Sequence, residues 1–330
     1  MALSGANTRS LTIWAVSDGR IGIENQALGL AEALARLTPA EVARRHVRFR
    51  PGYDRLPTAL KLAPGRFLTA DSDAIAPPWP DVWIAAGRAT LPFSLKMRSW
   101  SGGRTFVVQV QDPRWPARLF DAVVPPRHDA VTPGDNVIEI TGSPHRVTAE
   151  RLAHELAAFA PRIDPLPRPR VAVLVGGRSK SHDISPERAA RLAAGIAEAV
   201  ERAGGSLLMT TSRRTPERAR EILTDGLKHL PGIIWTGEGP NPYFAFLAAA
   251  DHILVTADSA NMATEAASTG KPVHILEVDG GGDKFDRLHA ELQGLGAARP
   301  FDGRLESWRY EPLRETDRAA AEILRRFHAR

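Results

Sequence analysis

The segment 252–272, HILVTADSANMATEAASTGKP, has residue types suited to binding a phosphate group. It predicts a buried strand that runs into a polar turn and then a helix of small residues. Unpaired N–H groups and the positive end of the helix dipole make such a helix start favourable for an anion. Asn261 and Glu265, four residues apart, share one helix face and could reach a sugar or ribose diol. The alternative is that Asp258 or Ser259 only caps the helix.

Three further strand ends in the second half of the chain carry polar or flexible residues. Glycines let the backbone approach a ligand, arginines pair with anions, and an aromatic ring can stack on a base. The structural alternatives are a helix cap at Ser212 and a core tyrosine beside a Gly/Pro turn. Because the carboxyl ends of parallel strands share one sheet edge, these groups predict a nucleotide diphosphate site. The residues concerned are Gly176, Gly177, Arg178, Thr211, Ser212, Arg213, Arg214 and Tyr243.

Metal-binding patterns are weak. The D-x-D sequence at 71–73 lies in a proline-bounded stretch away from any expected strand end, and we interpret it as a solvated loop. The ten histidines form no H-E-x-x-H pattern, and the chain has no cysteine. We therefore expect no metal site and no cofactor.

Composition and charge limit the class of protein. A chain of 330 residues with 43% hydrophobic and 25% charged residues is typical of a soluble protein of two domains. We expect no signal peptide and no membrane-spanning segment, and hence a cytoplasmic protein that could lie peripherally at the inner membrane face. Residues 1–165 carry 20 Lys and Arg against 16 Asp and Glu, an excess suited to an anionic membrane or to a solvated basic face. No nucleic-acid motif is present, so we expect no nucleic acid partner.

Short apolar strands alternate with helical patterns along both halves of the chain. This alternation predicts an α/β protein of two doubly wound, Rossmann-like domains that face each other across a cleft. We expect domains at 1–162 and 171–310, a proline-rich linker at 163–170, and a C-terminal helix within 311–330 that could pack across the domain junction. Strands are expected at 11–16, 42–49, 82–86, 106–110, 122–124, 137–140, 171–175, 206–210, 233–235, 253–255 and 273–276.

The pattern of the second half resembles the nucleotide-sugar-binding half of glycosyltransferases with the two-Rossmann GT-B fold. More closely, the chain resembles the mitochondrial fission, or "elongate mitochondria", family, which has many bacterial members. The resemblance implies a GT-B-like architecture with an N-terminal acceptor-side domain and a C-terminal nucleotide-sugar-binding domain. It does not by itself imply a reaction. The matching pieces are WAVSDGRIGIENQALGLAEAL, VQDP, VAVLVGG, TTSRRTP, NPYFAFLAAADHILVTADSANMATEAASTGKPV and GGDKF.

In related glycosyltransferases the loop that matches SDGRIGIENQ faces the cleft. Asp18 in this loop is our candidate general base for an acceptor hydroxyl, with capping of the following helix as the alternative. Asp112, in VQDPR, and His128, beside Asp129, also follow strands and are alternative bases.

The leading hypothesis is metal-independent transfer of a sugar from a nucleotide diphosphate donor to an unknown acceptor, for which a lipid-linked molecule is one option. The segments 56–68 and 91–100 mix apolar and cationic residues and could contact a membrane, although amphipathic core helices have the same pattern. The alternatives are a non-catalytic scaffold that recruits a protein partner, and hydrolysis or epimerisation of a nucleotide sugar.

Overall fold

The computed structural model describes residues 9–330, so part of the N-terminal segment considered for a signal peptide lies outside the described residues. The chain forms two compact units. The first contains residues up to 146 together with 314–330, and the second contains residues 147–313. The chain therefore leaves the first unit once and returns to it for its last helix.

A five-stranded parallel sheet is the centre of the first unit. Its strand order is β2-β1-β3-β4-β5, the flavodoxin-like order of a doubly wound sheet. The strands are β1 (Leu11–Ser17), β2 (Ala40–His46), β3 (Val82–Ala86), β4 (Phe106–Val110) and β5 (Ala122–Val124). The helices are α1 (Ile21–Leu37), α2 (Leu91–Trp100) and α9 (Glu315–His328), with short 3-10 turns η1 (Thr58–Leu60), η2 (Pro64–Phe67), η3 (Arg88–Thr90), η4 (Ala117–Leu119) and η5 (Arg127–Asp129).

The second unit has a six-stranded parallel sheet of order β13-β11-β10-β6-β8-β9. Numbered within the unit and read from its other edge, this is the Rossmann order 3-2-1-4-5-6. The strands are β6 (Arg170–Val175), β8 (Ser206–Thr211), β9 (Gly232–Trp235), β10 (His252–Thr256), β11 (Val273–Leu276) and β13 (Ala298–Pro300), with an antiparallel pair of β7 (His182–Asp183) and β12 (Asp279–Gly280). The helices are α3 (Ala149–Ile163), α4 (Pro186–Arg202), α5 (Glu217–Leu227), α6 (Tyr243–Ala249), α7 (Ala260–Ala267) and α8 (Asp283–Gly294).

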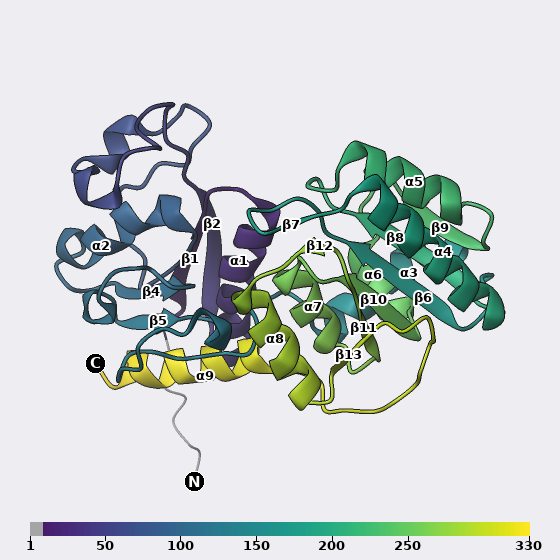
Figure 1. Cartoon of the computed structure of the whole chain (residues 1–330). Helices are drawn as coiled ribbons and strands as arrows, with labels where there is room; N and C mark the ends of the chain where they lie inside the picture. The colour runs from purple at the N-terminus through teal and green to yellow at the C-terminus, as the bar shows by residue number, and fades with distance from the viewer. Residues whose placement is uncertain (1–8) are drawn as a thin grey trace, which may run out of the picture. The chain divides into compact units, whose positions relative to one another are not determined.

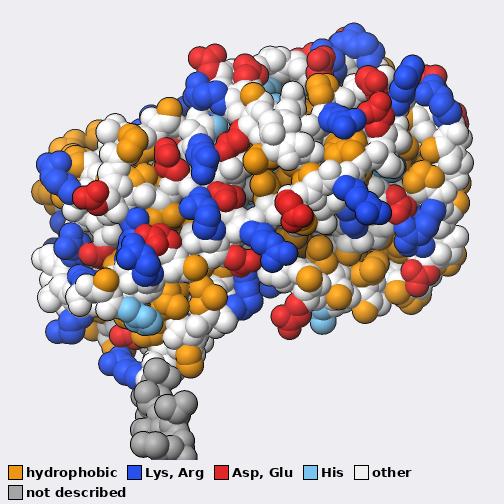
Figure 2. Space-filling view, turned by 90° about the horizontal axis from the view of Figure 1, so that it is seen from below, with side chains coloured by type: hydrophobic (Ala, Val, Ile, Leu, Met, Phe, Trp, Pro, Cys, Tyr) orange, Lys and Arg blue, Asp and Glu red, His pale blue; other side chains and the backbone are white. Residues whose placement is uncertain are grey.

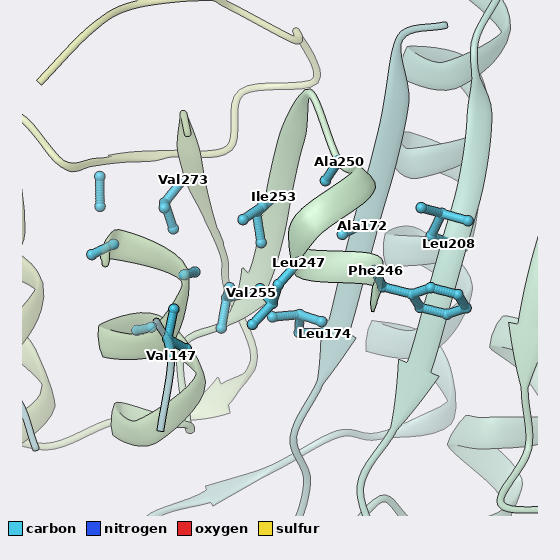
Figure 3. Packing of buried hydrophobic residues seen from close by; sticks show 14 of the residues in the cluster. Val147, Ala172, Leu174, Leu208, Phe246, Leu247, Ala250, Ile253, Val255 and Val273 are labelled. Atoms are coloured by element: carbon cyan, nitrogen blue, oxygen red, sulfur yellow. The ribbon is translucent and has the colours of Figure 1, made fainter. Parts of the chain in front are cut away.

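The central strands are apolar along their whole length because helices cover both faces of each sheet. In the second unit Leu174, Leu208 and Ile253 point to the side of α6, where Phe246 is fully buried (Figure 3). Residues of alternate parity in the same strands, such as Val173 and Met209, belong to the cluster on the opposite face. This two-sided burial confirms the expected fold class.

The domain limits differ from those expected. Helix α3 belongs to the second unit, because Phe159 and Ile163 join the same apolar cluster as α6. The proline-rich stretch 161–170 thus lies inside the second unit and does not connect the two units. Helix α9 packs on α1 in the first unit through Ala319, Ala320 and Ile323 (Figure 1).

One expected strand is not formed. The segment 137–140 makes only isolated bridges at Val137 and Ile140 in place of a strand. Within residues 9–330, no helix combines the length and the apolar character needed to cross a bilayer. On the face drawn in Figure 2, Lys and Arg side chains lie among Asp and Glu side chains.

Candidate functional site

The predicted phosphate-binding turns of the second unit meet where its strand order reverses, between β6 and β10. This switch point is where open α/β sheets bind ligands. The N–H of Gly177 donates to Oδ2 of Asp258 at 2.7 Å, and the N–H of Gly176 donates to Oγ1 of Thr256 at 2.7 Å. The hydroxyl of Thr256 in turn donates to Oδ1 of Asp258 at 2.7 Å. The turns that follow β6 and β10 are therefore joined by direct hydrogen bonds.

The turn after β8 joins the same cluster. Nη2 of Arg214 donates to Oδ2 of Asp258 at 3.1 Å, and Nη1 of Arg214 donates to the carbonyl of Gly177 at 3.3 Å. Ser212 Oγ donates to the carbonyl of Gly176 at 2.9 Å, and Thr215 Oγ1 donates to the same carbonyl. Three successive strand ends of the predicted site are thus brought together.

In this network, several residues that were expected to contact a ligand instead hold the turns together. The Asp258 side chain is fully buried and accepts bonds at both oxygens, so it holds the turns together. Ser212 does not cap α5 in the manner expected, since its hydroxyl bonds to the preceding turn. The glycines fit this packing, because a Cβ at Gly176 would lie 2.2 Å from the Asp258 carboxylate, and one at Gly177 would lie 2.2 Å from the Arg214 backbone.

The cationic groups at this edge differ in how they are engaged. The exposed Arg178 forms an ion pair with Asp183 at 2.6 Å. Arg213 is exposed and has no hydrogen-bond or ion-pair partner within residues 9–330. Thr211 is partly exposed at the end of β8. Arg213 is therefore the arginine of this edge best able to meet an anion.

Helix α7 begins at the same switch point. Its N-cap is Ser259, whose Oγ accepts from the N–H of Met262 at 3.5 Å. The cap leaves the first-turn positions Ala260 and Asn261 partly exposed beside the Asp258 network. The capping role and the phosphate role proposed for this helix start are compatible, since a cap satisfies only one of the terminal N–H groups.

Tyr243, which is half-buried, and the buried Glu265 form a hydrogen-bonded pair. The Tyr243 hydroxyl donates to Oε2 of Glu265 at 2.5 Å, and the Tyr243 ring packs on the core of the unit. The contact with the core agrees with the core-tyrosine alternative, and the exposed part of the ring still allows stacking on a base. Burial raises the pKa of Glu265 to about 7, a change that the Tyr243 hydrogen bond opposes, and burial also raises the pKa of Tyr243.

In the first unit the switch point lies between β1 and β3, and Asp18 follows β1 there. Its carboxylate accepts from the backbone N–H of Arg20 at 3.1 Å and from Nε of Arg20 at 2.8 Å. Asp18 is not the cap of α1, whose N-cap residue is Arg20. Gly87, which follows β3, faces it, since a Cβ there would lie 3.7 Å from Oδ2 of Asp18.

The two alternative bases are less favourably placed. Asp112 is exposed, and its Oδ1 accepts from the N–H of Arg114 at 2.8 Å within its own turn. His128 is buried in η5, so it does not face solvent. Neither position offers the partly exposed carboxylate at a switch point that Asp18 has.

Sequence reasoning missed Gln111, which follows β4 with a backbone φ of 70°. Its Nε2 donates to Oε1 of the buried Gln26 at 2.8 Å. A left-handed backbone is rare for a residue with a side chain and is concentrated at binding sites. No signal in the sequence marks it, although Gln26 lies in the quoted motif SDGRIGIENQ.

The D-x-D segment is a surface loop, as expected, and hydrogen bonds hold it in place. Oδ2 of Asp73 accepts from the N–H of His46 at 2.6 Å, and Asp71 pairs with Arg48 at 2.8 Å. Ser72 Oγ accepts from the N–H of Arg48 at 2.8 Å. These bonds fasten the segment to the end of β2.

Solved structures support the GT-B-like fold. The chain is similar to a putative UDP-N-acetylglucosamine 2-epimerase from Listeria monocytogenes, with 14% identity, 96% of this chain and 88% of that chain covered, and a TM-score of 0.56. It is also similar to the UDP-GlcNAc 2-epimerase of Methanocaldococcus jannaschii in complex with UDP-GlcNAc and UDP, with 15% identity, 96% and 99% coverage, and a TM-score of 0.55. At this identity the likeness concerns the fold alone.

Sequence comparison identifies the family. The chain is 32% identical over 277 residues to Mitochondrial fission protein ELM1 of Arabidopsis thaliana, which covers 76% of this chain and 65% of that protein. It is 27% identical over 356 residues to Uncharacterized protein RP120 of Rickettsia prowazekii (strain Madrid E), with 94% and 97% covered. The family model described as Mitochondrial fission ELM1 matches residues 21–327. The chain therefore belongs to the mitochondrial fission ELM1 family, as the resemblance of its motifs predicted.

Proposed function

We propose that this protein is a glycosyltransferase of the GT-B type that transfers a sugar from a nucleotide diphosphate donor to an acceptor hydroxyl, without a metal ion. The donor diphosphate would bind at the switch point of the second unit. The observation that carries the proposal is the exposed guanidinium of Arg213, which has no partner among residues 9–330 and lies next to the turns that the Asp258 network holds in place.

The hydrogen bonds to Asp258 hold the turns of this site in fixed positions. Transition-state charge is stabilised best by groups that do not reorganise during the reaction. Buried bonds from Gly177, Thr256 and Arg214 to Asp258 fix the turns after β6, β8 and β10. In this proposal, Arg213 and the start of α7 bind the leaving diphosphate and take over the charge compensation that a metal would provide.

Glu265 is proposed to hold a ribose or sugar hydroxyl. Its Oε2 accepts from Tyr243, whereas Oε1 has no hydrogen-bond partner within residues 9–330. A ligand hydroxyl that donates to Oε1 would favour the ionised form of a carboxyl whose pKa burial has raised to about 7. Donor binding would then depend on pH around neutrality.

The acceptor side of the chemistry is assigned to the first unit, with Asp18 as the general base. The carboxylate lies at the switch point of that unit, where the adjacent Gly87 leaves room. The ion pair with Arg20 orients the Asp18 carboxylate and also occupies one of its oxygens. Asp18→Asn should therefore lower turnover with little effect on donor affinity.

A thermal-shift screen over UDP, GDP, ADP, CMP and their sugars tests the donor site. Arg213→Ala should weaken binding of the best nucleotide by about tenfold or more, as expected for a lost charged hydrogen bond. Arg218→Ala is a matched control, because Arg218 is also exposed, lies on α5 and is paired with Glu221. If no nucleotide raises the melting temperature, or if both variants bind alike, the donor proposal fails.

Epimerisation or hydrolysis of a nucleotide sugar is the second candidate, favoured by the epimerases among the structures of similar fold. It uses the same donor site but needs no acceptor. Analysis of products with and without candidate acceptors separates the two reactions. A protein that binds no nucleotide would instead favour the scaffold alternative.

A further inference from the structure

In the segment Arg50–Leu68, which we call the leucine loop, a charged side chain is buried and apolar side chains are exposed. Lys61 is only 6% exposed, whereas the neighbouring Leu60 and Leu62 are 60% and 75% exposed. Lysine is almost never buried in this way without partners, and large exposed apolar side chains gathered in one place mark interaction surfaces. In Figure 1 the loop belongs to the excursion of loops and short helices between β2 and β3, above the sheet of the first unit.

The buried lysine fixes this arrangement. Nζ of Lys61 donates to the carbonyl of Leu56 at 2.7 Å and to that of Asp54 at 3.1 Å, and it lies 5.2 Å from the centre of the Phe49 ring. These contacts close the loop around its own ammonium group. Lys61 is buried and its neighbours Leu60 and Leu62 are exposed, so the two leucine side chains point away from the loop interior.

Further apolar side chains extend the exposed surface. Leu56 is 39% and Phe67 is 40% exposed. The Phe67 ring is stacked on Tyr53 at 4.1 Å, so it is held in place while one side remains open. A rigid apolar surface of this kind loses little conformational entropy when it is buried against another apolar surface.

Cationic groups accompany these apolar residues. Arg50, Arg55 and Arg66 are exposed, and the guanidinium groups of Arg55 and Arg66 have no hydrogen-bond or ion-pair partner within residues 9–330. The loop contains one acidic residue, Asp54, against four basic ones. On the face drawn in Figure 2, by contrast, the basic residues lie among acidic ones. Exposed leucines and exposed arginines in one loop match an anionic lipid surface.

The second segment considered for membrane contact does not share this character. Leu91, Phe93 and Met97 of α2 are buried in the core, and Trp100 at its end is the large apolar residue that remains exposed. Helix α2 is therefore a core helix, which leaves the leucine loop as the candidate surface.

We propose that the leucine loop docks the protein on membranes that contain anionic phospholipids. Leu60, Leu62 and Phe67 enter the interface between headgroups and acyl chains, while Arg55 and Arg66 bind lipid phosphates. The loop follows the carboxyl end of β2, the sheet edge on which Asp18 also lies. The proposal is independent of the donor site in the second unit.

Co-sedimentation of the full chain with lipid vesicles tests the proposal. Vesicles of phosphatidylcholine mixed with phosphatidylglycerol should bind the protein, more weakly as salt is raised, and vesicles of phosphatidylcholine alone should bind it much less. Leu60→Ser combined with Leu62→Ser should weaken binding at least about tenfold, and Arg55→Gln combined with Arg66→Gln should do so mainly at low salt. Leu37→Ser is the control, because Leu37 is 49% exposed in the same unit but lies outside the loop.

Three outcomes would overturn the proposal. The first is an absence of binding to anionic vesicles by the unaltered protein, and the second is equal binding by the Leu60/Leu62 variant and the Leu37 control. The third is a dimer in light scattering that the Leu60/Leu62 variant abolishes, which would make the loop an interface between two copies. Melting temperatures of all variants, with and without a bound nucleotide, show whether each is folded and keep this test separate from that of the donor site.

Discussion

The backbone N–H of Gly177 and the carboxylate of Asp258 are joined by a 2.7 Å hydrogen bond across 81 residues of sequence. The bond connects the ends of β6 and β10, the two strands between which the order of the sheet reverses. Any ligand bound at this switch point would contact turns whose positions depend on one buried carboxylate. The stability of the turns and the binding of a ligand are therefore coupled through Asp258.

Asp258→Ala should destabilise the second unit by about 3 kcal/mol, since it leaves the Gly177 N–H, the Thr256 hydroxyl and the Arg214 guanidinium without their acceptor. The midpoint of urea unfolding measures the effect. Asp225→Ala is the matched control, because Asp225 pairs with Lys228 on the exposed surface of α5 and should change stability by less than about 0.5 kcal/mol. Equal effects in the two variants would show that Asp258 is not a centre of stability.

Gly176→Ala should be destabilising by about 1–3 kcal/mol, because the added methyl group would lie 2.2 Å from the Asp258 carboxylate and would force the turns apart. Gly294→Ala is the control: the position lies at the end of α8, and an added Cβ there meets no atom within 4 Å. That change should be neutral or stabilising. A thermal melt of both variants decides the matter, and a stable Gly176→Ala protein would contradict the packing described for this turn.

The sequence predicted the α/β class because the strands are apolar along their length and alternate with amphipathic helices. It placed polar residues correctly at the ends of β6, β8 and β10. It could not show which arginine stabilises the turns and which is available to a ligand, because Arg213 and Arg214 are adjacent in the sequence and are both arginines. Only the folded position of Asp258 distinguishes them, and that position depends on contacts between distant segments.

The unit boundary shows a similar limit. The amphipathic pattern of α3 predicts a helix with one apolar face, but it does not tell which core that face covers. Phe159 and Ile163 pack with α6 in the second unit, so the boundary precedes the helix instead of following it. At 56–68 the sequence indicated a mixture of apolar and cationic residues, but it could not show that Lys61 is buried while Leu60 and Leu62 are exposed.

Glu265 should make the second unit less stable as pH rises. Its folded-state pKa of about 7 lies above its ordinary value of 4.5, so the folded protein binds more protons in this range. Its contribution to stability is therefore fully present below pH 4.5 and is lost as pH rises through 7. Glu265→Gln keeps an acceptor for Tyr243 and should remove this dependence. The difference in urea midpoint between the two proteins, measured from pH 5 to 8, should change in favour of the variant as pH rises, and a constant difference would rule the effect out.

His274 should have the opposite effect at acidic pH. Burial, together with the neighbouring His252, lowers its pKa to about 4, a change that Asp302 and Glu306 oppose. The folded state binds fewer protons than the unfolded state, so the contribution to stability is present above pH 6.5 and is lost as pH falls through 4. The ring lies 5.0 Å from the Trp308 ring and 6.1 Å from the Phe301 ring, so a charge there would disturb the packing of the segment after β13.

His274→Phe, which removes the titrating group and keeps a ring of similar shape, should reduce the loss of stability between pH 6.5 and 4. Melting temperatures at steps of pH measure the difference from the unaltered protein. His229→Phe serves as the control, because His229 is exposed and pairs with Glu201 on the surface. If the two variants lose stability in parallel with the unaltered protein, acid sensitivity arises elsewhere and the buried His252–His274 pair tolerates a proton.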